Sequence, residues 1–146
     1  MKKIIFVVIF IVGLLFSIPT TLEDTLTDKY LCTVYCKDSS LPYADMGIYK
    51  AIECSKSQLE CSIACCEEVK GISFTVSYSE ENLQELKETL MLVVKNTQKL
   101  ERLIVVYGYS SRLRGARVIE GRLINVQIAI TDNTITVASP IILGSF

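Results

Sequence analysis

Hydrophobic and polar positions alternate most clearly in the second half of the chain. Over residues 72–78, isoleucine, phenylalanine, valine and tyrosine alternate with serine and threonine, which is the pattern of a strand with one buried face. The segment 103–109 predicts a second strand, and 117–131 predicts a third, long strand. The dipeptide Asp132-Asn133 then predicts a tight turn, because both residues tolerate positive φ. A returning antiparallel strand is predicted over 134–142.

An amphipathic helix is predicted between the first two of these strands, over residues 80–98. Ser79 stands at the position of an N-cap, and Glu80 and Glu81 suit the positive end of a helix dipole. An apolar stripe follows at helical spacing: Leu83, Leu86, Leu90, Val93 and Val94. The order of strand, helix and three strands predicts an α+β domain over 71–146, an antiparallel sheet with the helix packed on one face.

The preceding segment, residues 21–70, is rich in cysteine, and its apolar spacing predicts helices. Residues 48–69 repeat apolar and cysteine positions at intervals of three, four and seven. Residues 23–37 form a second predicted helix, antiparallel to the first. The alternative is a strand over 30–36, in which Leu31, Thr33 and Tyr35 alternate with Cys32, Val34 and Cys36.

The first twenty residues have the layout of a secretory leader. Lys2 and Lys3 precede an apolar run over 4–16, and polar residues follow from position 17. The run is 13 residues long, whereas a helix that crosses a bilayer needs about 20. We expect residues 1–20 to be a signal peptide or an uncleaved N-terminal membrane anchor, with an ordinary buried helix as the alternative. Either of the first two predicts an extracellular protein or one anchored facing outward.

Composition narrows the function classes. The chain has no histidine, which excludes a Ser-His-Asp triad, a Cys-His pair and a His-ligated metal. It has no glycine-rich phosphate loop. Without Lys2 and Lys3, 13 of the 15 basic residues remain against 16 acidic ones, a net charge of −3, which argues against nucleic-acid binding. We therefore expect no enzyme, no cofactor and no bound nucleic acid.

All six cysteines lie between positions 32 and 66. In the predicted helical hairpin, one antiparallel register joins Cys32 to Cys65 and Cys36 to Cys61, and it leaves Cys54 and Cys66 over. Disulfides persist outside the cytoplasm, so export and disulfides support each other. Free or redox-active thiols and a metal site are the alternatives, although nearby glutamates disfavour a thiolate metal site and we expect none.

Two surface features remain. Arginines gather after position 101, and a locally basic loop suits an anionic partner; the candidate anion-binding residues are Arg112, Arg114, Arg117 and Arg122. The alternative is that these arginines only protect a sheet edge from aggregation. The second feature is a polar, uncharged sheet face that suits a polar ligand or is simply solvated; its residues are Asn125, Gln127, Thr134 and Thr136.

The C-terminal third resembles a known family. Tyr109-Ser110, the segment 125–129, Thr134 and the segment 139–142 resemble the C-terminal signature of the YwmB family, exported bacterial proteins with a fold like that of the TATA-box-binding protein. The resemblance implies a curved antiparallel sheet with helices on its convex side, and it implies no activity. It does not extend to DNA binding, because a TATA-type saddle needs a strongly basic rim.

These observations favour an exported, non-catalytic binding or structural protein of the cell envelope. The expected partners of its arginine-rich loop are anionic wall polymer or lipid head groups, and residues 4–18 give possible contact with a membrane. The alternatives are a thiol-redox or disulfide-linked oligomeric protein that uses the cysteines, and a nucleic-acid-binding protein.

Overall fold

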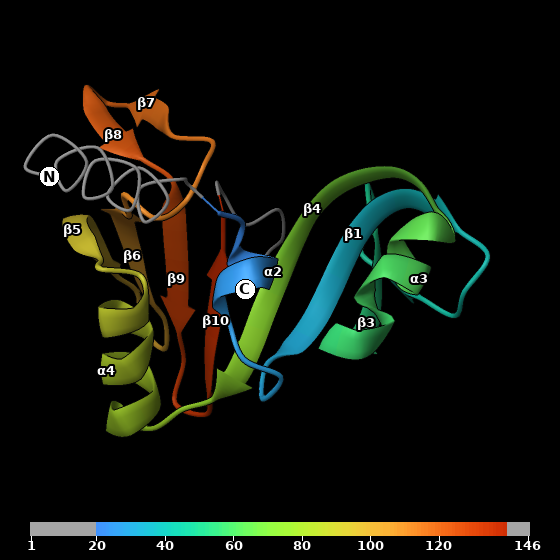
Figure 1. Ribbon diagram of the computed structural model, residues 1–146, viewed down its shortest axis with the longest axis horizontal. Helices are drawn as coiled ribbons and strands as arrows, with labels where there is room; N and C mark the ends of the chain where they lie inside the picture. The colour runs from blue at the N-terminus through green and yellow to red at the C-terminus, as the bar shows by residue number, and fades with distance from the viewer. Residues whose placement is uncertain (1–19, 140–146) are drawn as a thin grey trace, which may run out of the picture.

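The computed structural model describes residues 20–139, which form a continuous antiparallel sheet of eight strands in the order β2-β3-β1-β4-β10-β9-β6-β5 (Figure 1). The α+β class and the antiparallel sheet with a packed helix are confirmed. The predicted leader up to residue 19 and the end of the last predicted strand, from Pro140, lie outside the described residues. The strands of this sheet are β1 (Leu31–Ser39), β2 (Ala44–Asp45), β3 (Lys50–Ser55), β4 (Cys66–Ser77), β5 (Val93–Lys99), β6 (Ile104–Tyr109), β9 (Val126–Ile130) and β10 (Thr134–Ala138).

Smaller elements complete the fold. Strands β7 (Arg117–Ile119) and β8 (Arg122–Ile124) form a separate hairpin. The helices are α2 (Leu22–Thr25), the 3-10 turn η1 (Lys56–Gln58), α3 (Leu59–Ala64) and α4 (Glu80–Thr89). In Figure 1, α4 lies at the β5–β6–β9 end of the sheet, and α3 lies at the β1–β3 end.

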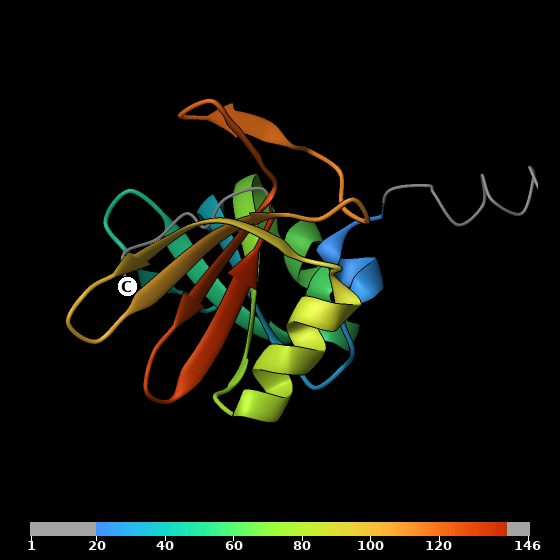
Figure 2. The same ribbon diagram turned by 90° about the vertical axis from the view of Figure 1, so that its left-hand side faces the viewer.

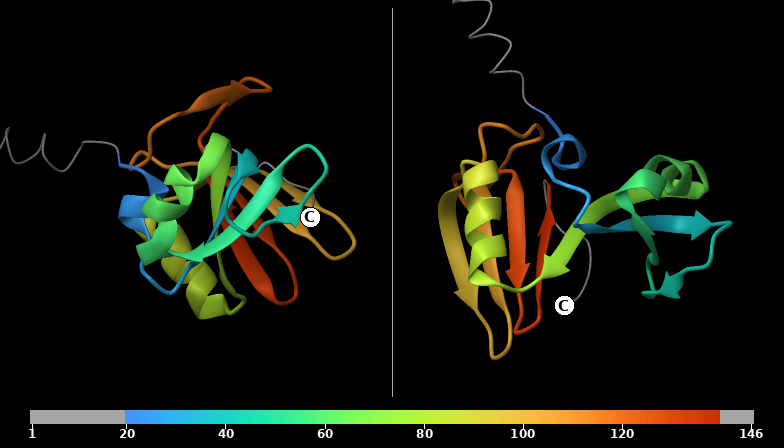
Figure 3. Two further views of the ribbon diagram at one scale, coloured as in Figure 1. Left: turned by 90° about the vertical axis from the view of Figure 1, so that its right-hand side faces the viewer. Right: turned by 60° about the horizontal axis from the view of Figure 1, so that its bottom comes forward.

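Strand β4 pairs with strands from both halves of the chain. It pairs with β1 along one edge and with β10 along the other, so that Phe74 stands opposite both Cys32 and Val137. The long curve of β4 is clear in the right-hand view of Figure 3. The predicted boundary at residues 70 and 71 falls inside this strand, and the two segments share one sheet.

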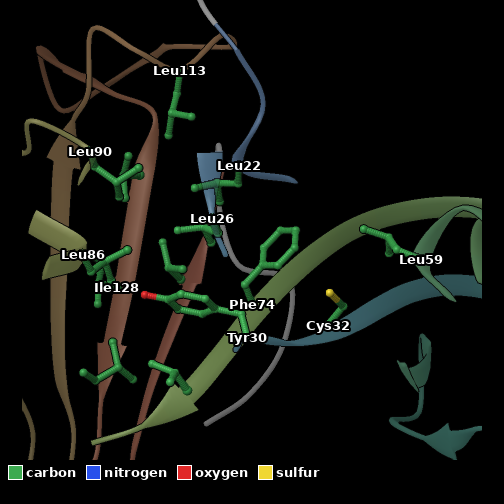
Figure 4. Packing of buried hydrophobic residues seen from close by; sticks show 14 of the residues in the cluster. Leu22, Leu26, Tyr30, Cys32, Leu59, Phe74, Leu86, Leu90, Leu113 and Ile128 are labelled. Carbon is green, nitrogen blue, oxygen red and sulfur yellow. The ribbon is translucent and has the colours of Figure 1, made fainter. Parts of the chain in front are cut away.

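One face of the sheet carries the main core. Inward side chains of β1 alternate with exposed or half-buried ones, as strand geometry requires, whereas β9 is buried on both faces. They pack with Leu86 and Leu90 of α4, Leu59 of α3, and Leu22 and Leu26 around α2, as Figure 4 shows. Leu59 and Leu90 are fully buried, so each helix anchors its own end of the sheet to the same core.

Helix α4 is shorter than the sequence predicts. The Ser79 side chain accepts a hydrogen bond from the backbone N–H of Asn82, which confirms the N-cap. The helix ends at Thr89 rather than at 98, and Met91 takes a left-handed φ of 47°. The N–H groups of Met91 and Leu92 then bond to carbonyls of the last turn, a closure that usually uses glycine. Residues 93–99 continue as edge strand β5.

The cysteine-rich segment is mainly strand, so the two predicted helices are wrong. Residues 31–36 of β1 alternate in burial, with Cys32, Val34 and Cys36 fully buried and Leu31 exposed. The alternative prediction of a strand over 30–36 is thus confirmed. Within the predicted helix 48–69, only the short η1 and α3 are helical. At the inward positions of these strands, cysteine stands where a β-branched residue is usual. The spacing of apolar and cysteine positions therefore resembled that of a helix.

The long strand predicted over 117–131 is broken twice. Glu120 and Gly121 have φ values of 49° and 71° and connect β7 to β8 as a two-residue turn of the I′ kind. Asn125 then separates β8 from β9. The predicted turn at 132–133 is present between β9 and β10, but it closes through Thr131, whose hydroxyl accepts hydrogen bonds from the N–H groups of Asn133 and Thr134.

Candidate functional site

The loop over residues 110–116, which we call the arginine loop, is fixed to the domain by one buried side-chain amide, that of Asn125. The Oδ1 atom of Asn125 accepts a hydrogen bond from the Ser110 N–H at 2.8 Å. Its Nδ2 atom donates to the carbonyls of Ser110 at 2.8 Å and Leu113 at 3.0 Å. Asn125 and Ser110 are both fully buried. A single side chain thus fixes three backbone groups of the loop.

Two further contacts fix the loop to the core. The Ser110 hydroxyl donates to the carbonyl of Leu90, at the end of α4, at 2.5 Å and accepts from the Arg112 N–H. Leu113 points down and is buried in the main core beside Leu22 (Figure 4). Because Ser110 and Leu113 point inward, the neighbouring positions Arg112 and Arg114 are left exposed.

The chain enters the described structure against this loop. Thr20 forms a parallel bridge with Leu113. Its N–H donates to the Arg112 carbonyl at 2.6 Å, and its own carbonyl accepts from the Arg114 N–H at 3.2 Å. Thr20, which the sequence analysis assigns to the leader, is therefore bonded to the folded domain. The apolar run over 4–16 precedes it by only a few residues.

The β7–β8 hairpin follows the arginine loop and projects from the sheet, as Figure 2 shows. Arg117 stands opposite Ile124, and Arg122 opposite Ile119, on one side of this hairpin. Val118 and Leu123 form the remaining cross-strand pair. They are 72% and 43% exposed, and because successive side chains of a strand point to opposite faces, this apolar pair lies on the side of the hairpin opposite the two arginines.

The side chains of Arg112 and Arg122 bond to backbone carbonyls rather than to carboxylates. Arg112 donates to the carbonyl of Thr89 at 2.8 Å, and Arg122 donates to the carbonyl of Lys95 at 2.9 Å. Both acceptors are neutral backbone groups. Within residues 20–139, the side chain of Arg117 makes no hydrogen bond or ion pair. Over 110–124, four arginines stand against Glu120 alone, a net charge of +3.

The structure thus brings the four predicted arginines onto one continuous segment. We call the exposed surface that carries Arg112, Arg114, Arg117 and Arg122 the arginine face. The apolar pair Val118 and Leu123, on the other side of the hairpin, was not predicted, because 117–131 was expected to form one half-buried strand. The Glu-Gly dipeptide, with its glycine, was the available signal for the turn.

The predicted polar face is not a single open surface. Asn125 points into the arginine loop, and Gln127 is only 6% exposed. The hydroxyl of Thr136 bonds to that of Thr75 at 2.9 Å, and Thr134 bonds to Thr131 at 2.9 Å. The prediction of a polar ligand on this face is wrong for Asn125, whose hydrogen-bonding groups are all used within the protein.

The structure does not place the predicted disulfide partners together. None of the six cysteines is paired in it, and they lie on β1, β3, α3, its C-cap and the start of β4 rather than on a helical hairpin. Cys32 and Cys36 are fully buried, whereas Cys61 is exposed on α3 and Cys65 caps that helix. Burial, together with the nearby Cys54 thiol, raises the pKa of Cys32 to about 11.

No group of three metal-ligating side chains is present among the residues that the structure describes. No helix in that part of the chain is long and apolar enough to span a membrane. Comparison of the chain with family models, curated proteins and solved structures finds no match. The resemblance to the YwmB family stays a prediction.

Proposed function

We propose that the protein is an exported, non-catalytic module of the cell envelope that holds its arginine face against an anionic phospholipid surface. The observation that carries the proposal is the position of Thr20. This residue links the apolar N-terminal run to the domain and is bonded directly to the arginine loop. If the run is retained in a bilayer, this loop is the part of the domain that lies next to the head groups.

Charge supports the same orientation. The domain without the leader is net negative, yet the arginine face carries a net charge of +3 over 110–124. Each arginine near an anionic lipid surface contributes about 1 kcal/mol of attraction. The acidic remainder of the domain is repelled from that surface, so electrostatics favours this face over every other.

The apolar pair favours lipid over a wall polymer. Val118 and Leu123 are aliphatic, exposed and opposite one another at the projecting hairpin. With arginines on one side and exposed aliphatic side chains on the other, the hairpin is amphipathic, which suits a position at the boundary between head groups and acyl chains. A wall polymer is a hydrated polyanion and would make no favourable contact with the aliphatic pair.

Amide hydrogen exchange on the full chain tests the proposal. The expected result does not depend on whether the N-terminal run is cleaved in the cell. The chain is mixed with vesicles of pure phosphatidylcholine, or of equal parts phosphatidylcholine and phosphatidylglycerol. We expect amides of residues 111–124 to exchange more slowly with the anionic vesicles. The double variant Arg117→Ala/Arg122→Ala should lower this protection by up to about 30-fold, because it removes about 2 kcal/mol of attraction.

The matched control is Lys37→Ala/Lys50→Ala. It changes the net charge equally, but both lysines lie on β1 and β3, at the α3 end of the sheet, in ion pairs with Glu67 and Asp38. This variant should retain the protection. Equal exchange of 111–124 with the two kinds of vesicle would refute the proposal. Protection by an anionic wall polymer and not by vesicles would assign the face to the polymer instead.

A further inference from the structure

Four cysteines surround one part of the core, beneath α3. Cys32 and Cys36 of β1 and Cys54 of β3 point to the inner face of the sheet and are buried. Leu59 of α3 is fully buried against them, and the three belong to one hydrophobic cluster with it (Figure 4). Cys66, at the start of β4, is half-buried beside the Cys36 thiol.

Only one pair of these cysteines is directly opposed in the sheet. Cys32 faces Cys54 in the β1–β3 ladder. Opposed residues in antiparallel strands have Cα atoms about 4.5 to 5.5 Å apart, and a disulfide needs about 4.4 to 6.8 Å. Cys36 instead faces Lys50 and Val69, and Cys66 faces Ser39. Backbone geometry thus singles out Cys32 and Cys54.

From this register we infer that Cys32 and Cys54 are a disulfide-forming pair that cross-links β1 to β3 when the protein meets a disulfide oxidant. The inference is independent of the arginine face. Both side chains lie on the inner face of the sheet, so a disulfide between them would replace two buried thiols without exposing apolar surface. It also differs from the pairing expected from the sequence, in which Cys32 joins Cys65.

The reaction is thiol–disulfide exchange with a small disulfide such as oxidised glutathione. The Cys54 thiolate, which is the less buried of the two, attacks one sulfur of the oxidant and displaces one glutathione thiolate. The Cys32 thiolate then attacks the Cys54 sulfur of this mixed disulfide and displaces a second glutathione. The protein loses two protons and two electrons, and the oxidised glutathione becomes two glutathione thiols.

The test is oxidation of the full chain under conditions that open the sheet transiently. The reduced protein is held in a glutathione redox buffer with urea near its unfolding midpoint, so that the buried thiols become accessible. Remaining thiols are then alkylated, and tryptic peptides are analysed without reduction. Trypsin separates Cys54, on peptide 51–56, from the peptide 57–70 that carries the last three cysteines. Cys32 and Cys36 share peptide 30–37.

The variant Cys36→Ala removes this ambiguity. We expect peptide 30–37 of the variant to be recovered mainly linked to peptide 51–56, as in the wild type. A variant with Cys54→Ala should lose that linked species and yield alkylated Cys32. Recovery of Cys32 mainly linked to peptide 57–70, or of both Cys32 and Cys54 alkylated after oxidation of Cys36→Ala, would overturn the inference.

Discussion

Replacement of Asn125 by alanine tests whether one amide holds the arginine loop. The variant leaves the Ser110 N–H and the carbonyls of Ser110 and Leu113 without their partner. Each buried backbone group that loses its hydrogen bond costs about 1 to 3 kcal/mol. Water reaches some of them as the loop relaxes, so we expect a total loss of about 3 kcal/mol. That is a large part of the roughly 5 to 15 kcal/mol typical of a domain.

Urea unfolding followed by circular dichroism measures this loss. With a slope of about 1.5 kcal/mol per molar urea, Asn125→Ala should lower the midpoint by about 2 M. Asn125→Asp keeps the shape and the acceptor for Ser110, but it replaces the two-hydrogen donor group with an acceptor, so it should be at least as destabilising. The control is Gln98→Ala, at an exposed position of β5, which should change stability by less than about 0.5 kcal/mol. A midpoint shift below about 0.5 M for Asn125→Ala would show that the loop does not depend on this side chain.

Three further outcomes are expected. Met91→Gly should stabilise the protein by about 0.5 to 1 kcal/mol in urea unfolding, because a left-handed residue after α4 is least strained as glycine; a destabilised variant would contradict the observed φ of 47°. Gly108→Ala should destabilise it by about 1 to 3 kcal/mol, because the added Cβ would lie 2.6 Å from a side-chain carbon of Leu92, and an unchanged thermal midpoint would argue against that packing. The reduced protein should lose stability as pH rises from about 9 towards 11. Burial is the largest of the causes that raise the pKa of Cys32 and Cys66 to about 11 from an ordinary 9.0, so the folded state must hold protons that the unfolded chain releases. Cys32→Ala should flatten this pH dependence, and an identical slope in the variant would refute its cause.

The sequence predicted the second half of the fold well where local signals and burial agree. The strand at 72–78 has a clear period and the cap at Ser79 marks a clear boundary, whereas the strand at 103–109 was recognised as a short apolar run. The helix was extended too far because Met91, rather than a glycine, ends it. The β-branched pair Val93 and Val94 was the available signal for a strand.

The first half was misjudged because cysteine is informative about neither helix nor strand. At Cys32, Cys36 and Cys54 it fills inward positions of the sheet as a small hydrophobe. The site was predicted in part: the arginines were identified, but the role of Asn125 was not. Its burial depends on a hairpin that inserts eight residues between the loop and β9, and no local pattern reveals such a long-range contact.

The position of β10 in the sheet has a consequence for biogenesis. This strand, Thr134–Ala138, lies between β4 and β9 and is the only link between the sheet's two halves among the described strands. Until it is synthesised, β4 and β9 each have an unpaired edge. The nascent chain therefore carries two open half-sheets whose closure depends on the last described strand, a slow, long-range step. A chain shortened before Thr134 should aggregate through these edges rather than fold partially.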